Sequence, residues 1–510
     1  MIISLSVLVI TIIVSGTYAL YKAQLSKNIG VNTTTHGLAY YINYVKGTDI
    51  TAATLNPSTS YEGGASSDIE FWKKDDSYDI YGKIELTVNT IGTNLSNSPA
   101  LKYAVVNNGN VLKEGSLKGT TSGSKVTILK NLYLEQTKQI YTVYVWLDNS
   151  EELGNISNES LSISVDCTAS LQKEPTAADT IISLYTSAAK VTATNNSITY
   201  NTAPSVSLMN DRLGGTTTSL DGGNIRYYGA SPNNYIYFNC SDYSNQTSST
   251  CETWRIIGVF DGKLKLIRGS QIGKYSWDNK NTSTGAENDA GKNDWTTARL
   301  MKLLNPSNYY KVDSNDNNLG QSLYYNSASG KCYSGQNNAT VDCDFTSTGI
   351  KNAETRNMIA ETTYNLGGWN SNSVYSNQIY EYERGTTVYS GRPTTWKGKI
   401  ALAYPSDYGY AADLNQCKDK TLYDYDNRTC TSNNWMKAII TNNGSNTGWL
   451  LTPNSGYSFY AWRVYSGGDV YYFSNAYFAY GAVPVLSLSS ELGIESGGDG
   501  SSSKPYKLSA

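Results

Sequence analysis

The stretch from Gly448 to Leu488 constrains the fold of this 510-residue chain more than any other part of it. Framework-type residues alternate there with a dense run of aromatic ones. Seven tyrosines and three of the chain's seven phenylalanines lie between Tyr457 and Tyr480. The alternation along residues 462–465 and 470–473 is typical of antiparallel strands. The stretch therefore predicts a sheet built on a fixed frame, whose members are Trp449, Pro453, Trp462, Gly467, Gly468, Val470 and Pro484.

The aromatic residues between the frame positions have two interpretations. Tyrosine mixed with Ser, Asn, Ala and Asp is the composition of a paratope. The same residues also suit half-buried cross-strand pairs. Ten aromatic side chains are too many for one core edge, which favours a binding face. The predicted ligand-binding residues are Tyr457, Phe459, Tyr460, Tyr465, Tyr471, Tyr472, Phe473, Tyr477, Phe478 and Tyr480. The predicted buried residues are Trp449, Trp462, Val464, Val470, Val485 and Leu488.

The overall charge argues against one class of partner. Charged residues make up 16% of the chain, and the net charge is −3. No basic stripe is present, and proteins that neutralise phosphates need one. We therefore expect no nucleic-acid partner.

The N-terminus reads as an export signal. Residues Ile2–Leu20 are apolar apart from Ser, Thr and Gly, which is long enough for a transmembrane helix. A cleaved signal peptide is the alternative, with Thr17-Tyr18-Ala19 as the cleavage site. We predict a transmembrane or signal segment over residues 1–27 and the membrane as a partner. The expected location is the extracellular face of the cell membrane, or outside the cell if the leader is cleaved.

The cysteines agree with export. Six of the seven form three local couples, each enclosing ten to twelve residues. Zinc would need a different pattern, because there is no CxxC and His36 is the only histidine. We predict the disulfides Cys240–Cys251, Cys332–Cys343 and Cys417–Cys430, with Cys167 unpaired.

The pattern along the chain predicts an α+β protein. Strand-like runs within residues 28–170 suggest an all-β sandwich that acts as a spacer. A linker with a short helix capped by Thr176 follows over residues 171–222. The main domain spans 223–508 and begins with polar loops around Cys240 and Cys251, which a hairpin at Asp261-Gly262 follows. Its expected helices cover Trp295–Leu304, Ile350–Asn365 and the region of Trp435–Ile440.

The order of motifs resembles a known family. The series WLLTP, AWRV, GDV and GAVPVLSL is similar to the C-terminal signature of the C-type-lectin-like fold. That fold occurs in formylglycine-generating-enzyme-like domains and in the variable proteins of diversity-generating retroelements. Upstream motifs such as GGNIRYYG and DWTTARLMKLLNP resemble surface proteins of gut-type Gram-positive bacteria. One departure is Val483, where the family pattern has arginine before the proline.

The resemblance covers about residues 210–508 and implies a C-type-lectin-like ligand-binding domain. In the variable proteins, adenine-rich codons encode the diversified positions, which here would be the ten aromatic residues. The expected partner is a protein or glycan ligand on another cell, phage or host surface.

The sequence argues against catalysis. An iron site of the enzyme branch needs histidine, and the motifs GxSxG, HExxH and the P-loop are missing. The cysteines lie in polar loops without a nearby base. Asp407, Asp413, Asp424 and Asp426 suit either a Ca²⁺ site or a solvated loop, and we expect no other metal or cofactor.

Three functions therefore remain. The first is a bacterial cell-surface adhesion protein that binds a ligand. The second is a structural component of a pilus-like or biofilm fibre. The third is an uncharacterised enzyme of the formylglycine-generating-enzyme-like fold.

Overall fold

The protein folds into two compact units, Met1–Glu174 and Pro175–Ala510, which we describe separately. The structure is a computed structural model. It describes residues 23–25, 41–51, 55–151, 153–156, 158–196, 198–212, 223–279, 290–311, 320–335 and 341–509.

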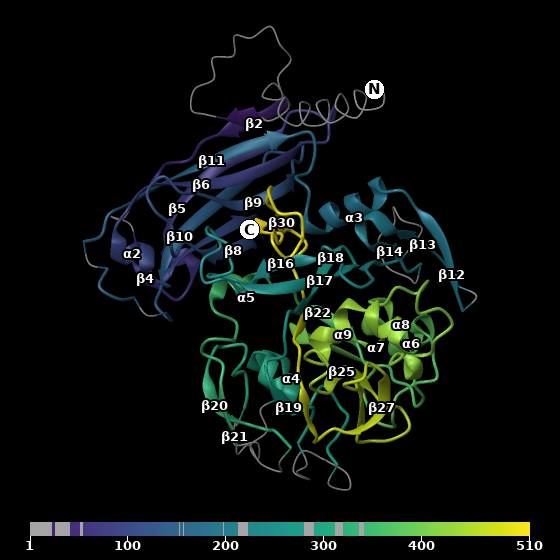
Figure 1. Ribbon diagram of the computed structural model, residues 1–510. Helices are drawn as coiled ribbons and strands as arrows, with labels where there is room; N and C mark the ends of the chain where they lie inside the picture. Colours follow the sequence, from purple (N-terminus) through teal and green to yellow (C-terminus); the bar gives the residue numbers. More distant parts are fainter. Residues whose placement is uncertain are drawn as a thin grey trace, which may run out of the picture. The chain divides into compact units, whose positions relative to one another are not determined.

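The first unit is a sandwich of two mainly antiparallel sheets (Figure 1). One sheet has the order β1-β11-β6-β9, with β3 beside β11, and the other has β2-β5-β10-β7-β8, with β4 beside β10. The strands are β1 Ala23–Leu25, β2 Ile42–Val45, β3 Ile50–Thr51, β4 Pro57–Ser58, β5 Ala65–Lys73, β6 Tyr81–Ile91, β7 Leu101–Asn107, β8 Asn110–Ser116, β9 Lys125–Tyr133, β10 Ile140–Asp148 and β11 Leu161–Ser170. The helices are η3 Tyr61–Gly63 and α2 Thr93–Asn97.

Alternation of side chains explains this sandwich. In β6, every second residue is buried, including Ile84, Leu86 and Val88. These side chains share one core with Phe71 of β5 and Val143 of β10 in the other sheet. A strand with one apolar face must bury that face against another layer.

The N-terminal prediction needs correction. Ala23–Leu25, inside the predicted segment 1–27, forms β1 and pairs antiparallel with β11. The predicted membrane helix is therefore wrong in its last residues, because their backbone is extended. Residues 1–22 lie outside the described part of the chain. Among the described residues, we find no helix with the length and apolar character of a membrane span. The transmembrane helix, and the membrane as its partner, are not retained.

The second unit is built on a nine-stranded antiparallel sheet and a five-stranded sheet (Figure 1). The large sheet runs β12-β13-β14-β15-β17-β18-β29-β24, with β16 beside β17, and the smaller one runs β19-β28-β25-β26-β27. The large sheet consists of β12 Val191–Asn195, β13 Ile198–Ala203, β14 Leu208–Asn210, β15 Ile225–Tyr227, β16 Tyr235–Phe238, β17 Glu252–Phe260, β18 Lys263–Arg268, β24 Ile400–Ala401 and β29 Val485–Ser487. The five-stranded sheet consists of β19 Lys274–Ser276, β25 Gly448–Pro453, β26 Tyr460–Val464, β27 Val470–Asn475 and β28 Ala479–Gly481.

Short strand pairs and short helices complete this unit. The pairs are β20 Ser329–Cys332 with β21 Val341–Asp344, β22 Thr362–Asn365 with β23 Thr395–Gly398, and β30 Gly493–Ile494 with β31 Leu508–Ser509. The α-helices are α3 Ala177–Ser187, α4 Arg299–Leu304, α5 Ala353–Met358, α6 Ser376–Glu383, α7 Pro405–Tyr410, α8 Arg428–Ser432 and α9 Trp435–Ile440. The 3₁₀ helices are η4 Pro204–Val206, η7 Ser307–Tyr309 and η8 Leu422–Asp424.

The predicted α+β class with a C-type-lectin-like domain is wrong. The protein is mostly β, with 37% of residues in strands and 15% in helices. The helix expected over Ile350–Asn365 is only α5, and Thr362–Asn365 instead forms β22. Its β-branched and aromatic residues pair with β23, with Tyr364 opposite Trp396. Residues 177–210, expected to form part of a linker, provide α3 and three strands of the large sheet.

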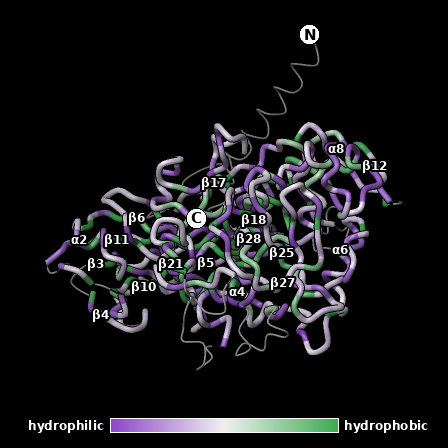
Figure 2. Tube along the Cα trace, turned by 60° about the horizontal axis from the view of Figure 1, so that its bottom comes forward, coloured by the Kyte–Doolittle hydropathy of each residue, from purple (hydrophilic) through white to green (hydrophobic). Residues whose placement is uncertain are grey.

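Two local predictions are confirmed in this unit. Asp261 and Gly262 have positive φ angles of 48° and 71°, and they join β17 to β18 as an antiparallel hairpin. Thr176 and Asp179 form the capping box of α3. Figure 2 colours the chain by hydropathy, and the apolar residues Ile256 of β17, Leu266 of β18 and Leu451 of β25 belong to the main buried core of the unit.

The cysteine pairing is confirmed. The structure contains the disulfides Cys240–Cys251, Cys332–Cys343 and Cys417–Cys430, and Cys167 is unpaired and buried in β11. Disulfides persist in oxidising surroundings. They indicate an extracellular or secreted protein.

Candidate functional site

The predicted aromatic residues lie on the five-stranded sheet and its connections. Tyr460 lies in β26, and three of the others lie in β27. Tyr480 lies in β28. The remaining positions are in the segments before β26, after β26 and between β27 and β28. We call all ten the aromatic face: Tyr457, Phe459, Tyr460, Tyr465, Tyr471, Tyr472, Phe473, Tyr477, Phe478 and Tyr480.

Burial separates the aromatic face from its frame. None of the ten residues is buried. Tyr457, Tyr465 and Phe473 are the most accessible, with exposed fractions of 52%, 46% and 44%. The six residues predicted to be buried are at most 1% exposed, namely Trp449, Trp462, Val464, Val470, Val485 and Leu488, whereas Gly467 of the predicted frame is exposed. The division follows the sequence-based expectation, whereas ligand binding by the ten residues stays a prediction.

The rings of seven residues form one contact network. Tyr460 is 4.5 Å from Phe459, 5.1 Å from Tyr457 and 6.3 Å from Phe473, measured between ring centroids. Phe473 is in turn 5.5 Å from Tyr471, and Tyr471 is 6.1 Å from Tyr465. Tyr472 joins through Phe473 at 4.9 Å. The loop before β26 and strand β27 therefore present a single surface.

The other three residues form a second group. Phe478 is 4.7 Å from Tyr477 and 5.7 Å from Tyr480. Phe478 and Tyr480 also pack against the main core, and Tyr472 packs against the core that contains Trp462. Tyr472, Phe478 and Tyr480 are therefore the members of the aromatic face that a ligand can reach least.

Arg463 links the two groups, and sequence analysis did not single it out. Its Nη1 donates a hydrogen bond to the Tyr480 hydroxyl at 2.9 Å. Its guanidinium carbon lies 5.0–5.5 Å from the ring centroids of Tyr465, Tyr471 and Tyr480. The guanidinium is thus held by cation–π contacts. The signal was present, because alternation along β26 buries Trp462 and Val464 and directs the residue between them to the opposite side.

Tyr423 of η8 also belongs to the surface. It is 50% exposed, and its ring centroid is 6.2 Å from that of Tyr471. It lies far from the aromatic stretch in the sequence, so no local pattern could have found it.

The charge beside Arg463 is nearly balanced. Asp469, directly before β27, is largely buried, and burial raises the pKa of its carboxyl. The neighbouring Asp426 raises that pKa further, whereas Arg463 lowers it. The aromatic face therefore combines rings, hydroxyls and one guanidinium with little net charge.

Buried amides hold the loop before β26. The Asn293 side-chain amide donates to the carbonyls of Asn454, Tyr457 and Tyr460 at 2.7–2.9 Å. The Asn454 side-chain oxygen accepts hydrogen bonds from the backbone N–H groups of Gly456 and Tyr457. Both asparagines are at most 1% exposed. Because these buried groups satisfy the loop backbone, the loop is ordered without a ligand.

The four aspartates considered for Ca²⁺ do not form a cation site. Asp407 is 1% exposed and ion-paired with Arg226 and Lys265. Asp424 accepts a hydrogen bond from the Thr421 hydroxyl. Within the described ranges, no group of three or more His, Cys, Asp or Glu residues is arranged to hold a metal ion.

Comparisons with known proteins add little. The sequence matches no protein-family profile, and no curated protein matches it significantly. Among solved structures, it is similar to a chain of the PBCV-1 virus capsid, with 12% identity, 43% of this chain and 59% of that chain covered, and a TM-score of 0.13. It is also similar to the receptor-binding domain of botulinum neurotoxin mosaic serotype C/D, with 11% identity, coverages of 52% and 75%, and a TM-score of 0.15. The chain thus spans less than two thirds of the capsid chain. Scores this low carry no argument, so function must be argued from the site.

Proposed function

We propose that this chain is an extracellular adhesion-type protein that binds a protein ligand through the aromatic face. The observation that carries the proposal is that none of the ten aromatic side chains is buried and three are exposed, whereas the six residues predicted to be buried are at most 1% exposed. Monomeric proteins rarely expose large contiguous apolar patches without an interaction to serve.

Rigidity supports the proposal. Tyrosine and phenylalanine have two side-chain torsions, so they lose little entropy when they bind. The loop that carries Tyr457 and Phe459 is already held by Asn293 and Asn454. A preorganised surface keeps more of its contact energy as affinity, because it does not have to be ordered on binding.

The ring geometry favours a protein over a sugar. Ring pairs on the aromatic face are tilted, with interplanar angles of 50–77°. Tilted rings present edges and hydroxyls together. Such a surface suits mixed apolar and hydrogen-bonding contacts better than a flat platform for a sugar ring.

The test is to pan a display library of randomised small domains against the immobilised protein. Tyr465, Tyr471 and Tyr477 are then changed together to Ser. We expect most selected binders to lose binding, while the melting temperature stays nearly unchanged, because surface substitutions usually cost about 0.5 kcal/mol or less each.

The matched control is Tyr78→Ser. Tyr78 is 44% exposed and lies in the first unit, against 46% for Tyr465. Binders that tolerate the triple variant as well as this control would show that the aromatic face is no preferred site. Gross destabilisation by the triple variant would show that these tyrosines are structural.

We also propose that the aromatic face tolerates sequence change. Replacing a solvent-facing ring leaves no cavity, whereas truncating a buried tryptophan costs about 3–5 kcal/mol. Sequencing paralogous copies from one genome should show variation at these ten positions and constancy at the frame. Variation spread evenly over both sets would refute this.

A further inference from the structure

A cavity in the Pro175–Ala510 unit is lined by none of the ten residues of the aromatic face. Its volume is about 380 Å³, within the range of small-molecule sites. It lies between the β17–β18 hairpin, β22, α6 and the segment before α7. Its lining includes Phe260, Lys265, Tyr364, Tyr380, Arg384 and Tyr404.

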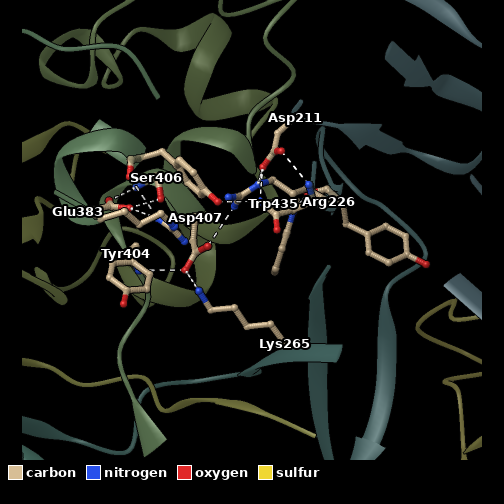
Figure 3. A network of polar contacts seen from close by, with 12 residues as sticks. Asp211, Arg226, Lys265, Glu383, Tyr404, Ser406, Asp407 and Trp435 are labelled. Carbon is tan, nitrogen blue, oxygen red and sulfur yellow. Dashed lines mark hydrogen bonds and ion pairs between the residues drawn. The ribbon is translucent and has the colours of Figure 1, made fainter. Parts of the chain in front are cut away.

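Figure 3 shows a buried ion-pair network that includes Lys265, a residue that also lines the cavity. Asp407 is contacted by Arg226 Nη1 at 3.1 Å and by Lys265 Nζ. Arg226 also donates to Asp211 at 2.5 Å. All four side chains are at most 7% exposed. The network therefore places Lys265 at the junction between buried charge and the cavity.

Six charged groups lie in or beside the cavity, in addition to Asp261 and Lys263 of the β17–β18 hairpin, which also line it. Arg226, Lys265 and Arg384 bring three cations, and Asp211 and Asp407 bring two ion-paired carboxylates. The sixth group is Glu383, whose carboxylate accepts hydrogen bonds from the backbone N–H and hydroxyl of Ser406. Burial raises the pKa of Glu383 to about 7, so its carboxyl is partly protonated at neutral pH. The carboxylate that pairs with Arg384 is therefore only partly ionised, with Arg384 Nη1 3.2 Å from Glu383 Oε2.

Arg384 offers donors to a ligand. Its guanidinium carbon lies 3.4 Å from the Tyr380 ring centroid, and its side chain is 27% exposed. Both of its hydrogen bonds, to the Tyr380 carbonyl and to Glu383, come from Nη1. A guanidinium has five N–H donors in a fork that matches a carboxylate. The N–H groups on Nε and Nη2 remain for an anion.

The tyrosines of the lining give the cavity an apolar surface. The hydroxyls of Tyr364 and Tyr404 donate to the carbonyls of Lys399 and Asn365, so these rings contribute mainly apolar surface. We propose that this cavity binds a sugar-sized organic acid. The carboxylate lies against Arg384 and Lys265, and the ring packs on the tyrosines.

The experiment is calorimetric titration of the full chain with D-glucuronate, and with D-glucose as the uncharged match. Glucuronate should bind one to one, and glucose should bind at least about tenfold more weakly, because it lacks the carboxylate that accepts charge-assisted hydrogen bonds from Arg384. This comparison of two ligands uses the wild-type protein alone. Equal binding of glucose, no glucuronate binding at millimolar concentration, or inorganic phosphate binding as tightly would overturn the proposal.

A variant locates the site. Arg384→Gln should weaken glucuronate binding by about tenfold or more. The control is Arg428→Gln, the same change at an exposed position of α8, which should leave binding unchanged. Unchanged binding in a folded Arg384→Gln protein would refute the site. The Tyr465, Tyr471 and Tyr477 triple variant should bind glucuronate like the wild type, so failure here is distinguishable from failure of the aromatic face.

Discussion

Replacing Asp407 by Asn tests whether the buried ion pairs stabilise the second unit. Asp407 is 1% exposed, and its two carboxylate oxygens contact Arg226 and Lys265. One of them also accepts the backbone N–H of Tyr404 at 3.0 Å, which caps α7. The two cations outweigh burial and hold the pKa of Asp407 below its usual value. Asparagine keeps the size and one acceptor oxygen, so the substitution removes mainly the charge.

The expected cost follows from the pairing. Removing one partner of a buried ion pair destabilises a protein by about 3–5 kcal/mol. A unit the size of Pro175–Ala510 has an unfolding entropy of about 0.7 kcal/mol/K, at about 2.1 cal/mol/K per residue. The melting temperature should therefore fall by about 4–7 °C. Because the folded pKa is lowered, this stabilisation is complete above the ordinary Asp pKa and is lost as the pH falls through the folded one.

Intrinsic tryptophan fluorescence during heating is a suitable assay, since eight of the ten tryptophans lie in the second unit. Asp426→Asn is the control, because Asp426 is exposed and the same chemical change there should cost about 0.5 kcal/mol or less. A fall at neutral pH that does not exceed the control would refute the reasoning, as would a difference that persists undiminished in acid.

Three further predictions concern single residues. Burial raises the pKa of Glu383 from 4.5 to about 7, so the second unit should lose stability as the pH rises between these values. Glu383→Gln should flatten this dependence of melting temperature on pH, and the exposed control Glu381→Gln should retain it; equal slopes would contradict the assignment. Asn293→Ala should speed amide hydrogen exchange across residues 455–459, because it removes three hydrogen bonds to loop carbonyls, and unchanged protection would show that the loop is rigid without them. Cys167 should resist a thiol reagent in the native protein and should be the single thiol that reacts after denaturation without a reducing agent. Reaction of additional thiols would contradict the three disulfides.

Local sequence patterns predicted several features of the structure. The cysteine pairs could be predicted because each couple is close in sequence. The hairpin at Asp261-Gly262 depends on two adjacent residues with positive φ. Alternation separated the buried Trp462 and Val464 from the more accessible Arg463 between them, since successive side chains of a strand point to opposite faces. These features need only short-range information.

Tertiary structure decided the rest. Thr362–Asn365 formed a strand because β23 was available to pair with it, and that pairing overrode the expected helix. The ion-pair network joins Asp211, Arg226, Lys265 and Asp407 from segments nearly two hundred residues apart. A buried charged group is stable only where the fold places an oppositely charged partner beside it. Because these partners come from distant segments, no local sequence pattern could predict this network. The sequence alone determined which residues would form the frame and the aromatic face. Only the folded chain determined how Arg463 and Asn293 organise that face, because their partners come from other strands and loops.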